Sequence, residues 1–208
     1  MNAQPIPTIT KNQLIKFGNH NWIILDVQDG RMLLLSYLVL ETRHYNHYPP
    51  YVASWELSKL RKYLNREFYL LSFSCEERER IETVSLPNNE NPWYRLHGNH
   101  KDTKDNIFLL SIEDVLKYFG DNLQLPSKAT KNKIPLEISN ECNNARVACD
   151  QYGIVSSWAL RTQGAEFDKI ACINGGISFG SINISGRSVR KRFGVRPALW
   201  VKLEQQKD

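Results

Sequence analysis

The chain has 208 residues, of which 41% are hydrophobic, a composition that supports one globular domain with a buried core. Its net charge of +5 comes from 27 basic and 22 acidic residues, a balance too even to demand a polyanionic partner. No apolar run approaches the roughly 20 residues of a membrane-spanning helix. The polar lead-in at residues 1–18 carries no signal-peptide pattern. The sequence therefore predicts a single domain over residues 1–208, located in the cytoplasm and without a membrane partner.

The first structured element is expected at residues 21–37, where two aliphatic runs flank Asp29 and Gly30. This dipeptide tolerates the positive φ angles of a type I′ turn, so the stretch predicts a β-hairpin. Both faces of each run are apolar. The hairpin is therefore expected to be covered on both sides, inside the domain.

Two helices are expected next. Residues 54–69 carry apolar side chains at three- and four-residue steps, which forms one apolar stripe, with Ser54 as the expected N-cap. Ser74 and Glu77 have the spacing of a capping box. A short helix is expected there, followed by a strand near residues 81–86.

The second half of the chain is expected to contain a helix, an irregular segment and several short strands. A helix is expected from Ser111, with Asp114 at capping distance, to Gly120. Residues 121–145 are polar and contain two prolines, which predicts an irregular excursion. Beyond them, short apolar runs broken by Gly, Ser and Asn are typical of a small antiparallel sheet. Helices early and strands late together predict an α+β fold.

Four cysteines at irregular spacing, Cys75, Cys142, Cys149 and Cys172, match neither a disulfide scaffold nor a Cys-x-x-Cys motif. Buried or incidental reduced thiols are the preferred interpretation. A single bridge between Cys149 and Cys172 remains as an alternative.

Candidate metal and phosphate motifs are weak. The pairs His44/His47 and His97/His100 have a spacing that suits zinc ligands on a helix, but both lie in loop-like sequence without a nearby cysteine. Residues 175–181 are glycine-rich but lack the lysine of a phosphate-binding loop. No nucleophile elbow, kinase signature or dinucleotide fingerprint is present. The sequence therefore predicts no metal, no cofactor and no catalytic residues, and the chain is not expected to be an enzyme.

The strongest charge cluster lies at residues 187–192. As a strand, this segment would place Ser188, Arg190 and Arg192 on one face. Two guanidinium groups on that face could hold a carboxylate or a phosphate. The preferred interpretation is a solvated edge strand whose cations prevent pairing with other strands.

The C-terminal sequence resembles an uncharacterised bacterial domain family that carries two motifs. Residues 156–164 are similar to its Trp-Leu-Arg-Ser-Pro-Gly-like motif through Trp158, Leu160 and Arg161. Residues 194–199 match its Gly-Val-Arg-Pro-Ala-Leu motif. Earlier stretches fit the same order, so the similarity covers nearly the whole chain.

That family looks like a branch of the C-type lectin-like fold shared with formylglycine-generating enzymes. The resemblance implies a C-type lectin-like domain whose N- and C-terminal strands are paired. Ala159 and residues 162–164 depart from the first motif, and a different loop shape is expected after Arg161. Gly194 is expected to allow a bend, and Pro197, which lacks an amide donor, suits the start of a closing strand.

The motif residues are expected to be structural, with Arg161 and Arg196 as buried hydrogen-bond donors. They are Trp158, Arg161, Gly194, Arg196 and Pro197. The resemblance implies that the segment between the motifs is the ligand face.

The sequence thus predicts a non-catalytic recognition module that presents residues 164–192 to a protein or a glycan. Its expected contact residues are Glu166, Asp168, Asn174, Asn183, Arg187, Arg190 and Arg192. One alternative is a formylglycine-generating-enzyme-like oxidase, which the lack of a second cysteine after Cys172 disfavours. The other is weak nucleic-acid binding through residues 187–192. This alternative is disfavoured because the chain lacks the paired stacking aromatic residues and the groove-binding helix of such modules.

Overall fold

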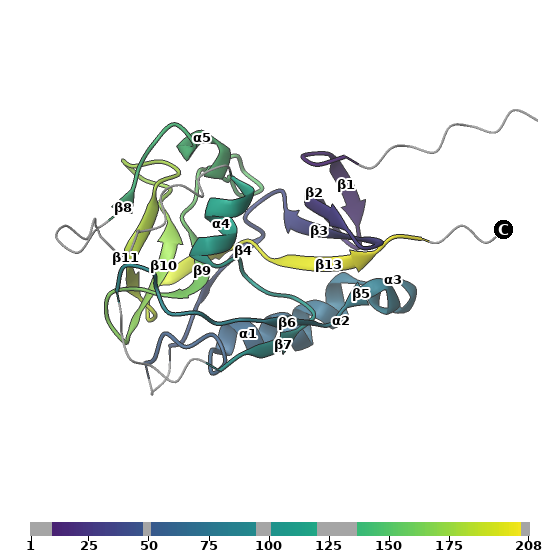
Figure 1. Ribbon diagram of the computed structural model, residues 1–208, viewed down its shortest axis with the longest axis horizontal. Helices are drawn as coiled ribbons and strands as arrows, with labels where there is room; N and C mark the ends of the chain where they lie inside the picture. Colours follow the sequence, from purple (N-terminus) through teal and green to yellow (C-terminus); the bar gives the residue numbers. More distant parts are fainter. Residues whose placement is uncertain (1–9, 48–50, 95–100, 120–136, 205–208) are drawn as a thin grey trace, which may run out of the picture.

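The computed structural model describes residues 10–47, 51–94, 101–119 and 137–204 (Figure 1). Within these residues, thirteen strands form sheets of five, six and two strands. The five-stranded sheet has the order β1 (Leu14–Phe17), β2 (His20–Gln28), β3 (Arg31–Ser36), β13 (Ala198–Lys202) and β5 (Ile81–Glu82). The six-stranded sheet has the order β4 (Glu41–His44), β12 (Arg192–Val195), β9 (Trp158–Gln163), β10 (Lys169–Ile173), β11 (Ile182–Ser188) and β8 (Glu137–Ile138).

The remaining elements are short. The third sheet pairs β6 (Val84–Leu86) with β7 (Thr103–Asp105). The helices are α1 (Lys59–Tyr63), the π-helical turn η1 (Leu64–Phe68), α2 (Tyr69–Ser72), α3 (Cys75–Arg80), α4 (Ile112–Tyr118) and α5 (Asn143–Arg146). Among the helices described, none has the length and apolar character needed to cross a membrane.

The prediction of an α+β, C-type lectin-like fold with helices early and strands late is wrong, because the structure is mostly β. Strands begin at Leu14, well before the first helix at Lys59, and the five-stranded sheet combines the first three strands with the last one. The aliphatic runs of the first 45 residues pair with one another and with the C-terminal strand. Helices are limited to the short segments between them.

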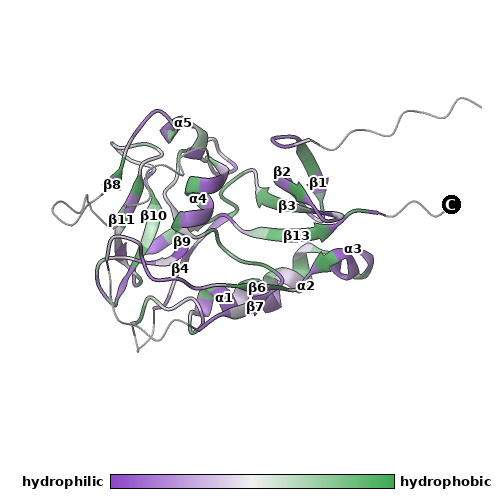
Figure 2. Cartoon of the chain, viewed as in Figure 1, coloured by the Kyte–Doolittle hydropathy of each residue, from purple (hydrophilic) through white to green (hydrophobic). Residues whose placement is uncertain are grey.

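The predicted hairpin is confirmed. β2 and β3 pair antiparallel around Asp29 and Gly30, which have φ angles of 51° and 70°. β13 then pairs with β3, from Ala198 opposite Leu35 to Lys202 opposite Arg31. Figure 2 shows the apolar character of β13, which crosses the middle of the molecule. The C-terminal strand therefore lies inside the sheet that the first hairpin begins.

The two large sheets are joined through the C-terminal motif. β12 belongs to the six-stranded sheet, and the chain passes through Arg196 and Pro197 into β13 of the five-stranded sheet. Gly194 does not mark the expected bend, since it lies within β12, between Thr42 of β4 and Trp158 of β9. A Cβ at Gly194 would overlap the carbonyl oxygen of Ser157, so close strand packing explains this glycine.

The helix caps agree with the sequence in two of three places. The capping boxes of Ser74 with Glu77 and of Ser111 with Asp114 are both formed. The first helix begins later than predicted, because Ser58, not Ser54, accepts the capping hydrogen bond. The predicted helix end at Gly120 lies outside the described residues, as do residues 121–136 of the predicted excursion.

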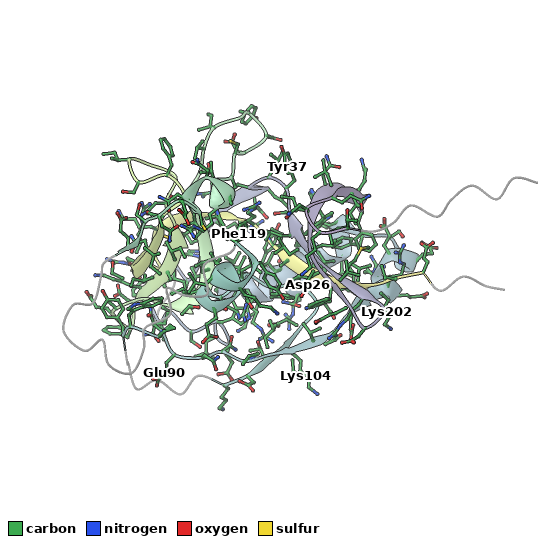
Figure 3. All side chains as sticks on the ribbon, turned by 45° about the horizontal axis from the view of Figure 1, so that its top comes forward. Asp26, Tyr37, Glu90, Lys104, Phe119 and Lys202 are labelled. Carbon is green, nitrogen blue, oxygen red and sulfur yellow. The ribbon has the colours of Figure 1, made fainter. Side chains whose placement is uncertain are left out.

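The core contains a buried polar centre beside its aliphatic side chains. Asp105 is 1% exposed and accepts hydrogen bonds from Trp55 Nε1 at 2.8 Å, Thr103 Oγ1 at 2.7 Å and Arg61 Nε at 2.6 Å. Because its lone pairs are used, the buried carboxylate is satisfied. Figure 3 shows side chains filling the space between the elements, while Lys104 points outward.

Candidate ligand-binding face

Two short loops at one end of the six-stranded sheet expose large apolar side chains. They are residues 150–157, before β9, and residues 174–181, between β10 and β11. Tyr152 and Ile154 of the first loop and Ile177 and Phe179 of the second each expose more than half of their surface. We call these four side chains the apolar tips.

The first loop is a tight turn organised by one aspartate. The Asp150 carboxylate accepts hydrogen bonds from the backbone amides of Tyr152 at 2.9 Å and Ile154 at 3.0 Å. The Asp150 amide donates to the Ile154 carbonyl at 2.9 Å, and Cys149 and Val155 form a β-bridge below. An aspartate that bonds its own downstream backbone is a common turn former. Tyr152 and Ile154 therefore project from a fixed backbone.

The second loop is closed by Asn174 and Gly180. The Asn174 amide donates to the Ser181 carbonyl at 2.9 Å, and the Gly180 amide donates to the Asn174 carbonyl at 2.8 Å. The Asn174 side chain also donates to Ser181 Oγ at 2.9 Å and to Glu137 Oε2 at 3.1 Å. These bonds occupy the polar groups at the base of the loop and leave Ile177 and Phe179 outside.

The two loops lie against each other. The Gly175 amide donates to Ser157 Oγ at 2.9 Å, which joins the second loop to the first. Arg187 reaches across from β11, donating to Asn174 Oδ1 at 3.1 Å and to Ser157 Oγ at 3.4 Å. Figure 1 shows α5 at this same end of the molecule. The two loops that carry the apolar tips are therefore joined at their bases.

A buried arginine ties α5 to the second loop. Arg146 is 0% exposed and donates from Nε to the Gly180 carbonyl at 2.7 Å and from Nη2 to Asn143 Oδ1 at 2.6 Å. Its own carbonyl accepts a hydrogen bond from Trp158 Nε1 at 3.1 Å. Trp158, a residue of the first motif, thus supports the loop region from within the core.

The surface beside the second loop is hollowed, with a volume of about 450 Å³. Its lining is rich in amide and hydroxyl groups around one aromatic ring: Ser139, Asn140, Glu141, Asn143, Asn144, Ile177, Ser178 and Phe179. A hollow next to exposed apolar side chains can receive a protruding side chain of a partner.

The seven predicted contact residues do not form one site. Glu166 pairs with Lys169 at 2.5 Å, and Asp168 accepts from Ser188 Oγ at 3.4 Å, both near the β9–β10 turn. This turn is at the other end of β10 from Asn174. The expected contacts are therefore divided between the two ends of the sheet.

Two of the predicted contacts serve the fold instead. Asn174 was expected to be exposed but is buried at the base of the second loop, as described above. Asn183 is half-buried, and its Oδ1 accepts from Ser185 Oγ at 2.9 Å and from the Gly186 amide at 2.7 Å. In both residues the side-chain oxygen accepts hydrogen bonds from neighbouring groups of the same domain. Arg187 is exposed and lies beside the apolar tips.

The predicted strand at residues 187–192 is also wrong. β11 ends at Ser188, and the Lys191 amide donates to the Ser188 carbonyl at 2.9 Å, so the chain turns before β12. Arg190 then lies over the ring of Tyr51, 5.2 Å from its centroid, whereas Arg192 bonds to Thr42. The turn separates the two guanidinium groups, which do not share a strand face.

Arg161 and Arg196 are buried hydrogen-bond donors, as expected. Arg161 Nη1 donates to the Leu109 carbonyl at 2.8 Å and pairs with Asp114. Arg196 Nε donates to the Ser36 carbonyl at 2.9 Å, and its guanidinium lies 5.0 Å from the ring centroid of Trp158. Burial lowers the pKa of Arg196 to about 10, so it stays charged at neutral pH.

The cysteines and histidines show no reactive arrangement among the described residues. All four cysteines are free thiols, so the alternative bridge between Cys149 and Cys172 is not formed. Burial raises the pKa of Cys172 to about 12, which keeps its thiol protonated. The His44 and His47 rings lie 5.1 Å apart, but no group of three metal-ligating side chains is found in the described part of the chain. His97 and His100 lie outside it.

The sheets and loops define a mostly β domain that exposes apolar side chains at one end. Over residues 29–203 the chain matches a protein family described as a domain of unknown function (DUF6273), and it belongs to that family. No curated protein and no solved structure matches it. Neither the family match nor the sheet order supports the C-type lectin-like or formylglycine-generating-enzyme-like assignment.

Sequence reasoning missed the apolar tips. Their signal was present, since Tyr152 precedes Gly153, and Ile177 and Phe179 lie between Gly176 and Gly180. Large apolar residues in glycine-bounded turns are candidates for exposure, because a turn lies on the surface.

Proposed function

We propose that this domain is a protein-recognition module and that the apolar tips, with the hollow beside Phe179, are its contact face. The observation that carries the proposal is the exposure of four large apolar side chains on two adjoining, hydrogen-bonded loops. Large apolar side chains exposed on adjoining loops are candidates for an interaction site, because soluble proteins rarely leave large apolar patches exposed.

Composition favours a protein ligand over a glycan or a membrane. Tyrosine, phenylalanine and isoleucine bury large areas, and aromatic residues are enriched in the cores of protein interfaces. Residues 150–157 and 174–181 contain no lysine or arginine. Anionic lipids are attracted by clustered cations, which these loops lack.

The backbone geometry supports specific binding. Asp150 fixes the first loop, and Arg146 and Asn174 fix the second. Because these loops are already ordered, little conformational entropy is lost when a partner binds. The four side chains supply contact area and no nucleophile or acid–base pair, which suits a non-catalytic role.

The proposal can be tested by site-specific photo-crosslinking in cells. A photoreactive phenylalanine analogue at Ile177 is expected to label a protein partner, whereas the same analogue at Leu71, an exposed residue of α2, is not. With the purified partner, the double variant Ile177→Ser/Phe179→Ser should weaken binding by about tenfold or more, as expected for anchor residues. Leu71→Ser is the matched control.

Two results would contradict the proposal. Equal labelling of the same partner from positions 177 and 71 would show non-specific contact. Unchanged affinity in the double variant, with its fold intact by circular dichroism, would place the contact face elsewhere.

A further inference from the structure

A second hollow, of about 310 Å³, is lined by residues of β4, α1 and β12, by His47 after β4, and by none of the apolar tips. Its lining is strongly polar: Glu41, Thr42, Arg43, His44, His47, Lys59, Leu60, Tyr63 and Arg192. We call it the cationic pocket. The volume is at the lower end of the range for small-molecule sites, about 300 to 1,000 Å³.

The charges that line the cationic pocket do not cancel. Arg43, Lys59 and Arg192 are cations and Glu41 is the one carboxylate in the lining, which leaves +2 from these four side chains. Glu41 is already satisfied, since it accepts from Arg43 Nε at 2.7 Å and from the Tyr63 hydroxyl at 2.6 Å. Burial and the bond to Glu41 raise the pKa of Tyr63 to about 12, so this hydroxyl remains a neutral donor. The uncompensated cations are Lys59 and Arg192.

The cationic side of the pocket is held in place. Arg192 donates from Nε and Nη2 to Thr42 Oγ1, at 3.4 and 3.2 Å, and from Nη2 to the Thr42 carbonyl. Nη1 is therefore the group that can turn toward a ligand. The Arg43 guanidinium lies 3.4 Å from the ring centroid of Tyr63, which fixes that wall of the pocket.

The histidine edge has a defined tautomer. His44 Nδ1 lies 2.7 Å from the Arg190 carbonyl, and because a carbonyl only accepts, Nδ1 carries the hydrogen. Nε2 is then the ring atom left to face a ligand. The His47 ring lies beside it at 5.1 Å. In this tautomer Nε2 is an acceptor and cannot donate to an oxyanion, so the donors that this pocket offers to an anion are those of Lys59 and Arg192.

We propose that the cationic pocket binds a phosphomonoester group carried by a small molecule. A phosphomonoester bears a charge of about −1.5 to −2 at neutral pH and three acceptor oxygens, which matches the excess charge and the donors of Lys59 and Arg192. A carboxylate carries one charge and leaves one cation unpaired. A phosphodiester backbone needs a basic stripe, whereas this pocket is a single hollow. The site is separate from the apolar tips and does not depend on them.

The test uses the full chain and isothermal titration calorimetry at low salt, with O-phosphoserine and inorganic phosphate as probes and serine as the blank. The double variant Lys59→Ala/Arg192→Ala is expected to weaken phosphoserine binding by about tenfold or more, since two charge-assisted hydrogen bonds are lost. The matched control, Lys191→Ala/Lys202→Ala, removes the same charge from two exposed lysines outside the pocket and should change affinity less than about twofold. In the wild type, amide resonances of Thr42, His44 and Lys59 should shift on titration.

Three outcomes would overturn the inference. The first is the absence of binding heat and of amide shifts with phosphoserine at concentrations up to about 10 mM, a range in which even millimolar affinity would be detected. The second is an equal loss of affinity in the two double variants, which would show that the overall charge, and not this pocket, determines binding. The third is tighter binding of a duplex oligonucleotide than of phosphoserine, lost equally in both double variants, which would assign the cations to nucleic acid.

Discussion

The buried guanidinium of Arg146 donates from Nε to the carbonyl oxygen of Gly180 at 2.7 Å. This bond fastens the turn of the second loop to α5, and Gly180 itself packs directly on the backbone of Asn143. The exposed side chains of Ile177 and Phe179 therefore project from a loop that is anchored in the core. The order of the proposed contact face depends on this junction.

Gly180→Ala is expected to disrupt the junction. Gly180 has a φ of +71°, and a Cβ there would overlap the Asn143 carbonyl. The variant should therefore lose about 1 to 3 kcal/mol of stability. Gly176→Ala is the matched control, because its Cβ would meet nothing within 4 Å. Urea denaturation of both variants checks the prediction. Equal stability of the two would mean that the loop is free to move away from α5.

Leu199→Ala tests the C-terminal strand. Leu199 is 0% exposed in β13, and its truncation should cost about 2 to 5 kcal/mol through lost burial and a residual cavity. Leu71→Ala, at a side chain that is 77% exposed, should change the free energy of unfolding by less than about 0.5 kcal/mol. A loss of less than about 0.5 kcal/mol for Leu199→Ala would show that β13 is not part of the core.

Arg190→Ser/Arg192→Ser should leave the fold nearly intact, because both guanidinium groups are exposed and exposed charges contribute little, up to about 1 kcal/mol. Arg196→Ser, at the buried arginine of the C-terminal motif, should instead cost about 2 to 4 kcal/mol. Thermal unfolding distinguishes the two variants. A collapse of the double variant would contradict the surface assignment.

Nucleic-acid binding by the same arginines is expected to be weak and independent of sequence. A net charge of +5 and two cations separated by a turn neutralise few phosphates, so binding should fall steeply with salt and vanish near physiological ionic strength. Fluorescence anisotropy with a labelled duplex measures it. Submicromolar affinity at physiological salt, lost in Arg190→Ser/Arg192→Ser, would establish the nucleic-acid function instead.

Alkaline pH should destabilise the protein through buried acids. Burial raises the pKa of Cys172 to about 12 and also raises the pKa of Tyr45. A raised folded-state pKa gives stability that is complete below the unfolded-state values, about 8.5 for Cys and 10 for Tyr, and is lost as pH rises through the folded values. The free energy of unfolding should therefore fall above about pH 9. Cys172→Ala should reduce that slope, and an unchanged slope would mean that the thiol is not buried in solution.

The local features of this fold were predictable from the sequence. The Asp29-Gly30 turn and the Ser74 and Ser111 capping boxes each depend on residues close together in the chain. Such signals fix backbone geometry within a few residues, because φ angles and capping bonds are local. The buried state of Arg161 and Arg196 was expected from their place in the two motifs that the resemblance identifies.

Only the tertiary structure decided how these elements combine and where a ligand can bind. Short apolar runs predict strands but not their partners, so the division of β12 and β13 between two sheets was not readable. The loops that carry the apolar tips meet through Ser157 and Gly175, and the cationic pocket brings Arg192 to Lys59, 133 positions earlier in the chain. Contacts over such distances depend on how the sheets dock, and local periodicity carries no information about docking. The sequence by itself therefore determined the first hairpin and two of the three helix caps, and the packing of the elements created both candidate sites.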